Sequence, residues 1–373
     1  IHFSPVLFLV LPIYKLFQSP STLLVLQSLV VSLGIVPLYL IGVYELKNRD
    51  YALFFCLLYL IYPPLLGLSL FDFHTQAFVP LFFFSAFYFF LKKKFVPYFL
   101  FVILALSVVE FVPFLVVFLG LYAFWVGWKE IKNSRKSFNY RLLFRGTMAV
   151  AILTIVLAVG WYVGARMALF NFNPTVLPNR NWSQLGDPVH NPLGLLWTAV
   201  TNPLLTLQLV FSSGWEKLTY LFGVLAPVGL LSFLDIPALL IGAPWFLAAF
   251  LSNYPPYFTV IGYQYVAFMI PFVFISAVRG TRNLPRLKER FNVVRRFSTY
   301  LGNRKKQVLA GFYISILIVS YALIFYQPHL SFLAARMSVR SEQHLSALNG
   351  ILALVPADAS IMTQNDILPH ASQ

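Results

Sequence analysis

The stretch FVPYFLFVILALSVVEFVPFLVVFLGLYAFWVGW, residues 95–128, decides the fold class, because its 34 residues contain a single charged side chain, Glu110. As one helix it would be about 51 Å long, whereas the hydrocarbon core of a bilayer is about 30 Å thick. Lysines lie directly before and after the stretch. We therefore expect two short membrane helices with a turn at Glu110 and Pro113 that returns the chain to its starting side.

The composition of the whole chain agrees with this interpretation. Of the 373 residues, 59% are hydrophobic, 18% aromatic and only 10% charged. This is more apolar surface than one soluble core can bury, so the sequence predicts an all-α integral membrane protein and excludes a soluble enzyme. The single Cys56 lies in an apolar run, which leaves no disulfide framework and no cysteine metal site.

Ten apolar runs are candidate spans of a polytopic helical bundle, which we expect to occupy residues 1–326. They cover approximately residues 23–43, 51–71, 77–91, 95–109, 111–128, 147–165, 218–234, 237–251, 259–278 and 308–326.

The basic residues predict the orientation of this bundle. If successive spans cross the membrane in opposite directions, one side of the membrane holds the connections 44–50, 92–94, 129–146, 235–236 and 279–307. These connections hold 21 of the 27 lysines and arginines, so the positive-inside rule makes this side cytoplasmic, with 279–307 as a long basic loop. The formal charge of +15 then reflects topology and anionic lipid headgroups, not a nucleic-acid partner.

All six histidines and several carboxylates fall on the opposite side. Asp72 and His74, in the sequence FDFH at the end of a span, are candidate catalytic residues; the alternative is a helix-capping Asp and a solvated His. Glu110 is a third candidate, because a carboxylate at the bilayer centre costs about 2.5 to 3.5 kcal/mol and needs a polar cavity or partner. The alternative for Glu110 is a turn residue at headgroup level.

A divalent cation is a possible cofactor. His2, Asp72 and His74 together offer ligands for one, although their spacing matches no known metal motif. Phosphate-binding loops, zinc helices and nucleophile elbows are absent from the sequence. Any chemistry must therefore use isolated carboxylates and histidines.

A further group of residues predicts substrate binding near the same membrane border. Lys217, Arg166 and Arg180 are candidates for holding an anionic phosphate, and Tyr220, Gln264 and Tyr265 lie near the ends of the late spans. The alternative for the cations is snorkelling toward the headgroups, and for the aromatic residues an interfacial belt.

Two external segments complete the predicted organisation. Residues 166–217 form a long external loop whose apolar run 193–211 is interrupted by Asn202 and Pro203, which favours an interfacial helix or a pair of half-helices in contact with membrane lipid. Residues 327–373 begin an external domain, with a helix over 342–354 and a strand over 359–363.

Several blocks of the sequence carry a resemblance to a known family. IHFSPVLFLVLPIYKLFQSPSTLLVLQSLV, LYLIYPPLLGLSLFDFHTQAFVPL, WEKLTYLFGVLAPVGLL, GYQYVAFMIPF and DASIMTQNDILPHAS resemble successive parts of the uncharacterised prokaryotic membrane family called domain of unknown function 2079. That family is similar to the GT-C glycosyltransferases, which move a sugar from a lipid-phosphate donor to an acceptor at the outer face. The resemblance implies a GT-C-like fold in the plasma membrane of a prokaryote, with the motif-bearing face outside the cytoplasm.

The resemblance also implies residue roles. Family members carry a Lys-Glu-acid run where this chain has Val109-Glu110-Phe111, so only the Glu carries over. GT-C enzymes place their main carboxylate on the first external loop, and this chain starts near the end of that loop. We therefore expect a fragment whose main base and first span lie upstream of Ile1.

The expected function is glycosyl transfer from a polyprenyl-phosphate sugar. Glu110 or Asp72 would help to deprotonate the acceptor hydroxyl, and Lys217 would bind the lipid phosphate. His74 and His2 would orient the substrate or a metal ion. Two alternatives remain: a transporter or flippase for a lipid-linked or small anionic solute, and a non-catalytic assembly subunit. A transporter predicts polar residues along a continuous path to the cytoplasm, whereas an enzyme predicts polarity confined to the outer half.

Overall fold

The computed structural model of the chain describes residues 2–133, 146–174, 180–290 and 342–356, together with Ile314, Ile318 and Ala322. Within these residues every regular element is helical, which confirms the all-helical prediction. Most of the expected span 308–326, most of the basic loop 279–307 and the strand 359–363 lie outside the described residues. The helix expected over 342–354 is present as α19 (Glu342–Leu352).

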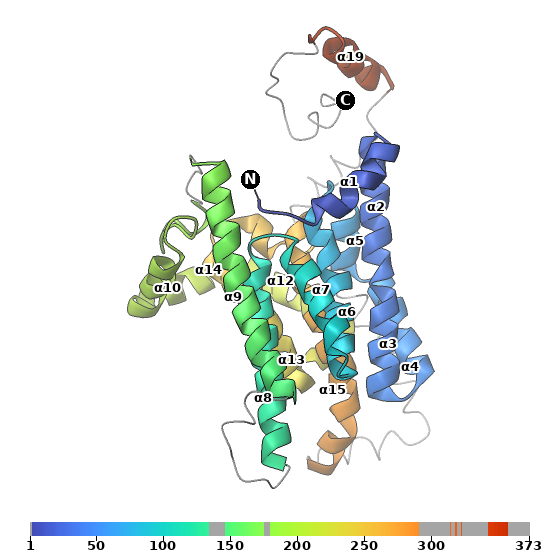
Figure 1. Cartoon of the computed structure of the whole chain (residues 1–373), viewed down its shortest axis with the longest axis vertical. Helices are drawn as coiled ribbons and strands as arrows, with labels where there is room; N and C mark the ends of the chain where they lie inside the picture. Colours follow the sequence, from blue (N-terminus) through green and yellow to red (C-terminus); the bar gives the residue numbers. More distant parts are fainter. Residues whose placement is uncertain are drawn as a thin grey trace.

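The remaining elements follow one another in a bundle of long and short helices (Figure 1). They are α1 (Leu7–Leu16), α2 (Pro20–Leu33), α3 (Ile35–Leu46), α4 (Arg49–Leu60), α5 (Pro63–Ser69), η1 (Thr75–Phe78), α6 (Val79–Leu91), α7 (Phe95–Leu106), α8 (Val112–Asn133), α9 (Gly146–Phe172), η3 (Arg180–Trp182), α10 (Pro192–Thr201), α11 (Pro203–Phe211), α12 (Gly214–Leu225), η4 (Ala226–Val228), η5 (Leu231–Asp235), α13 (Ile236–Leu239), η6 (Leu240–Gly242), α14 (Ala243–Leu251), η7 (Pro255–Phe258), η8 (Gln264–Phe268) and α15 (Ile270–Arg290).

Four helical segments of the described chain are long and apolar enough to cross a membrane: Pro20–Leu46, Val112–Asn133, Gly146–Phe172 and Leu231–Leu251. The count rises to six if each of two bent helix pairs, α4 with α5 and α10 with α11, forms one span. The sequence predicted nine spans within the described part of the chain, since the tenth, 308–326, lies mostly outside it, so fewer long apolar helices are present there than expected. Thr75–Leu91 and Phe95–Leu106 are apolar but short, because tight turns on both sides end these helices early.

The turn expected at Glu110 is present. Helix α7 ends at Leu106 and α8 begins at Val112, so the apolar stretch is broken at 107–111. At the other ends of the two helices, Lys93 Nζ lies 2.8 Å from Glu130 Oε1. This ion pair shows that the chain returns to its starting side, as predicted.

The connections expected on the cytoplasmic side gather at one end of the bundle, which we call the basic end (residues 44–50, 92–94 and 129–133 with Arg279 and Arg282). The Lys92 ammonium lies 4.9 Å from the centre of the Tyr44 ring, and Lys93 pairs with Glu130. Arg279 contacts both Glu45 and Asp235. Contacts within the described residues thus group these connections as the charge pattern predicted.

A buried charge network at the basic end was not predicted from the sequence. Arg279 of α15 donates to Glu45 of α3 and to Asp235 of η5, and Arg282 donates to the second oxygen of Glu45. The side chains of Glu45 and Asp235 are only 3% and 6% exposed. Two carboxylates and two guanidiniums neutralise one another there, which ties three distant segments together.

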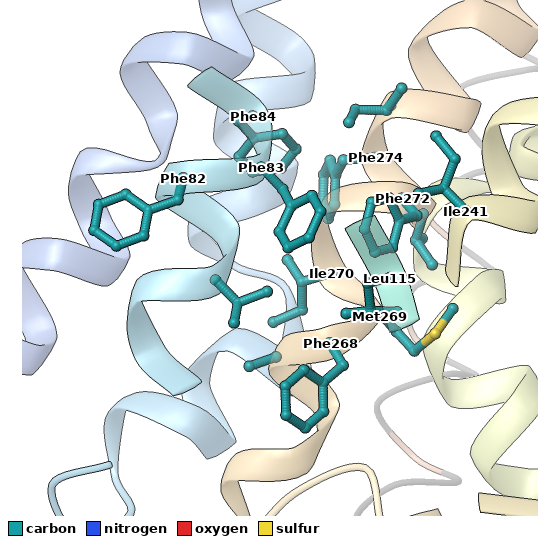
Figure 2. Close-up of a cluster of buried hydrophobic side chains, with 14 of the residues drawn as sticks. Phe82, Phe83, Phe84, Leu115, Ile241, Phe268, Met269, Ile270, Phe272 and Phe274 are labelled. Carbon is teal, nitrogen blue, oxygen red and sulfur yellow. The ribbon is translucent and has the colours of Figure 1, made fainter. Parts of the chain in front are cut away.

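Between the two ends, the core is apolar and rich in phenylalanine. Phe83 and Phe84 of α6 face Phe272 and Phe274 of α15 (Figure 2), and the rings of Phe83 and Phe272 lie 5.0 Å apart at 77°. All four are almost completely buried. The middle of the described bundle is therefore a packed apolar layer.

The chain reversal expected at 235–236 occurs earlier, at Gly229 and Leu230. Both residues have left-handed backbone conformations, with φ of 68° and 56°. Glycine adopts this conformation without steric penalty, and Pro227 has already ended the preceding α-helix. Residues 231–251 then form one continuous helical segment, so the expected division between spans 218–234 and 237–251 is wrong in position.

The predicted span 259–278 is helical only in its second half. Residues 255–268 form two short 3-10 helices joined by extended backbone, and α15 begins at Ile270. Val260, Val266 and Phe268 are nevertheless buried. Irregular backbone is tolerated at membrane depth where other protein segments surround it, and here η8 packs against α5, η1 and α6.

Candidate functional site

The candidate carboxylate Glu110 lies at the end of the bundle opposite the basic end. We call this region the turn end (residues 2–3, 71–75 and 107–111). Glu110 Oε1 lies 2.6 Å from Nδ1 of His2, and its Oε2 accepts a 3.2 Å hydrogen bond from the backbone N–H of Phe3. The N–H of Val6 donates to the carbonyl of Ser107, which fixes the N-terminal segment over the turn. Two predicted site residues, His2 and Glu110, are thus in direct contact.

The surroundings of Glu110 keep it ionised. Burial raises the pKa of its carboxyl group, but the hydrogen bond and charge of His2 and the N–H of Phe3 outweigh burial. The net pKa therefore lies below the ordinary value of 4.5. Because His2 is exposed to solvent, the pair offers both a proton acceptor and a path for the proton to water.

Asp72 and His74 are positioned by Gln27, a residue that sequence reasoning did not select. Gln27 is fully buried in α2; its Nε2 donates to the carbonyls of Leu68 and Phe71 at 3.1 and 3.0 Å, and its Oε1 accepts the N–H of His74 at 2.8 Å. One amide group therefore satisfies three backbone groups of the broken segment 68–74. One sequence feature could have identified Gln27 as important: it is the only amide side chain in the apolar run TLLVLQSLVVSL.

The FDFH segment and the Glu110 turn belong to the same end of the molecule. The Thr75 hydroxyl donates to the carbonyl of Val108 at 3.1 Å, which joins the residue after His74 to the turn that carries Glu110. His74 Nδ1 donates to the backbone carbonyl of Asp72 at 2.9 Å. Within the described part of the chain, however, no three His, Cys, Asp or Glu residues lie close enough to hold a metal ion. His2, Asp72 and His74 therefore do not form the expected cation site.

Lys217 has a different environment from the one expected for a phosphate-binding residue. It is 1% exposed, and its ammonium donates to the carbonyls of Leu209 and Phe250 at 2.6 and 2.7 Å and to the Ser212 hydroxyl at 3.2 Å. Protein acceptors thus match all three donors of the ammonium. This arrangement joins the start of α12 to the end of α11 and of α14.

Tyr220, Gln264 and Tyr265 lie in or beside an aromatic cluster around Trp245. The Tyr220 hydroxyl accepts the Trp245 indole N–H at 3.1 Å, and the Tyr265 ring stacks on Trp245 at 5.6 Å. Phe111, next to Glu110, packs edge-on against Trp245 at 5.2 Å. The cluster therefore forms an aromatic wall behind the Glu110 turn. Gln264 is also buried, and its Oε1 has no hydrogen-bond partner among the described residues.

Arg166 lies near the end of α9. One of its N–H groups donates to the carbonyl of Val189, and the guanidinium lies 4.9 Å from the centre of the Phe170 ring. Asp187 and His190 form an ion pair beside it in the following loop. Arg180 begins η3, but its side chain lies outside the described residues, so the structure does not connect it with Arg166 or Lys217.

The predicted pair of half-helices is present as α10 and α11, which meet at an angle of 98°. Asn202 and Pro203 separate them, since proline cannot donate the hydrogen bond that would continue α10. Trp197 and Phe211 are 71% and 74% exposed. The two half-helices thus present exposed apolar side chains.

The turn end thus combines an ionised carboxylate paired with an exposed histidine, a buried amide that orders the FDFH segment, and an aromatic wall. No curated protein and no solved structure matches the chain. The family described as "Predicted membrane protein (DUF2079)" matches residues 1–373. The chain therefore belongs to this family of predicted membrane proteins.

Proposed function

We propose that the protein transfers a sugar from a polyprenyl-phosphate donor to a hydroxyl acceptor, and that the reaction takes place at the turn end. The observation that carries this proposal is the pairing of Glu110 with His2. Glu110 accepts the proton of the acceptor hydroxyl, and the acceptor oxygen then forms a bond to the anomeric carbon of the sugar. The bond between that carbon and the phosphate oxygen breaks, and the polyprenyl phosphate leaves with the electron pair.

The His2 ring has a supporting role in this reaction. It orients the carboxylate through the 2.6 Å contact, and its exposed ring offers the proton a path from Glu110 to water. The aromatic wall formed by Phe111, Trp245 and Tyr265 excludes water from the inner side of the carboxylate. Asp72 and His74, held by Gln27, position the acceptor from the neighbouring segment.

The packed core favours an enzyme over a transporter. A transporter needs polar groups along a path between its two ends, whereas the layer of Phe83, Phe84 and Phe272 in the described bundle is apolar and tightly packed. Buried hydroxyl groups such as that of Thr154 occur between the two ends, but the buried ion pairs of the described residues lie at the basic end. The positive-inside rule then assigns the turn end to the outside of a prokaryotic plasma membrane, where lipid-linked sugars are the available donors.

The test is a transfer assay with the purified protein and radiolabelled polyprenyl-phosphate sugars. Removal of a general base costs about 10²- to 10⁴-fold in rate, so Glu110→Gln should lower turnover by that amount. Glu216→Gln, at an exposed glutamate in the first turn of α12, is the matched control and should keep the wild-type rate. Absence of turnover by the wild-type protein with all donors, or equal rates for both variants, would refute the proposal.

A further inference from the structure

Arg166 lacks a counter-ion among the described residues, although it lies on an apolar helix. Its guanidinium carries five N–H donors, and Val189 accepts from one of its nitrogens. The other contacts are with the faces of Phe170 and Tyr162, at 4.9 and 5.9 Å from the ring centres. No described carboxylate forms an ion pair with Arg166, whereas Asp187 nearby pairs with His190. With respect to the part of the chain that the structure describes, the guanidinium therefore has donors without an acceptor and no carboxylate partner.

An open hollow of about 430 Å³, exposed along the face of α9, lies beside this guanidinium. Its lining is mostly apolar and comes entirely from α9: Tyr162, Val163, Arg166, Met167, Phe170 and Asn171. Among the described residues of that lining, Arg166 is the only cation. A site of this kind fits a ligand that has one anionic group next to a hydrocarbon chain.

The position of Arg166 along α9 places it at the depth of lipid phosphates. The helix begins at Gly146 at the basic end, where the hydroxyl of Thr147 donates to Glu130. Arg166 follows Gly146 by twenty positions, or about 30 Å along the helix axis, which equals the thickness of the hydrocarbon core. If Gly146 lies at one membrane border, Arg166 lies at the other.

We propose that the hollow on α9 binds the phosphate group of an anionic lipid. The guanidinium of Arg166 pairs with the phosphate oxygens, and Val163, Met167 and Phe170 contact the hydrocarbon next to the phosphate. Lys217 cannot take this role, since its three donors already have protein acceptors.

This site extends the proposed function to its donor side. The Tyr162 ring lies 5.9 Å from the Arg166 guanidinium and packs against Phe114 at 5.0 Å, and Phe114 packs against Phe111, the residue next to Glu110. A phosphate held at Arg166 would bring the sugar that it carries toward the Glu110 turn. The binding of a lipid phosphate does not itself require that a sugar be transferred.

The test measures lipid adducts of the purified chain by native mass spectrometry in neutral detergent. The probes are farnesyl phosphate, dioctanoyl phosphatidate and, as a zwitterionic reference, dioctanoyl phosphatidylcholine. Loss of one charge-assisted bidentate contact weakens binding about tenfold, so Arg166→Gln should raise the Kd of both phosphate monoesters by that factor. Arg49→Gln, at an exposed arginine of the basic end, should leave both values unchanged.

A second variant keeps the test decisive if Arg166→Gln folds poorly. Val163→Trp fills the hollow without removing the charge and should also weaken the binding of the phosphate lipids. If a folded variant, either Arg166→Gln or Val163→Trp, bound the phosphate lipids with the same Kd as the wild type, the proposal would be overturned. Tighter binding of farnesyl phosphate than of phosphatidate identifies a prenyl lipid as the ligand, whereas equal binding identifies bulk anionic phospholipid.

The outcome separates this site from the proposed function. Binding that depends on Arg166, in a protein that transfers no sugar, would retain the lipid site and refute the enzyme. Sugar transfer in a protein whose lipid binding ignores Arg166 and Val163 would retain the enzyme and refute this site.

Discussion

Glu110 and His2 lie 108 positions apart in the sequence, yet their side chains are joined by a contact of 2.6 Å. Because the pKa of Glu110 lies below its ordinary value of 4.5, its ionised form stabilises the folded state. This contribution is fully present above the unfolded pKa and is lost as the pH falls through the folded pKa. We expect the wild type to be more stable than Glu110→Gln near pH 7, with the difference shrinking below about pH 4.5.

Thermal unfolding of the two proteins in detergent at a series of pH values measures this difference. His2→Gln should remove most of the same pH dependence, because His2 supplies the opposing contact. A stability difference that stayed constant from pH 7 to pH 3 would contradict the pairing.

Gln27→Leu should destabilise the protein and release the segment that carries Asp72 and His74. The change removes three hydrogen bonds from a buried position, and each backbone group left unsatisfied costs about 1–3 kcal/mol. Hydrogen exchange of residues 68–75 should increase more than exchange in α8. Gln18→Leu, at an exposed glutamine, is the control and should leave both measurements unchanged.

Arg279→Met should destabilise the protein by about 3–5 kcal/mol, because it leaves Glu45 and Asp235 buried with too little positive charge. Lys93→Met breaks the exposed pair with Glu130 and should cost less than about 1 kcal/mol. Chemical unfolding of both variants measures the contrast. Similar losses in the two would show that burial does not govern the strength of these pairs.

Gly280→Ala tests the close approach of α15 to η5. A Cβ at position 280 would lie 2.1 Å from the carbonyl oxygen of Leu231, so the two segments must move apart. We expect a lower unfolding temperature. Gly160→Ala in α9 meets no atom within 4 Å and should be neutral or stabilising, since alanine favours a helix over glycine by about 1 kcal/mol.

The predicted orientation can be checked with single cysteines introduced into a Cys56→Ser background. Cys56 is buried, and its replacement by serine should alter the fold little. A membrane-impermeant maleimide should label Asp72→Cys in intact cells and Lys47→Cys only after permeabilisation. Labelling of both positions in intact cells would contradict the assignment of the two ends.

The sequence was most informative where charge interrupts apolar runs. The turn near Glu110 followed from the length of the apolar stretch, and Lys93 and Glu130 confirm that the chain returns. The grouping of the basic connections followed from the positive-inside rule. These features depend on one-dimensional spacing, which the sequence contains directly.

The sequence was least informative where two distant segments satisfy each other. Gln27 looked like one polar residue in an apolar helix, and its role appears only when segment 68–74 bends around it. Lys217 carries a charge that suggested a ligand, but the carbonyl of Phe250 already accepts from it. Neither the reversal at Gly229 nor the pairing of Asp235 with Arg279 leaves a periodic signal in the chain.

The phenylalanine layer between the two ends also limits how a reaction at the turn end is powered. Phe83 and Phe272 pack against each other in the middle of the described bundle, and under the proposed function the activated sugar does not pass through this layer. The free energy for bond formation would in that case arrive within the bilayer, as an activated head group on a lipid.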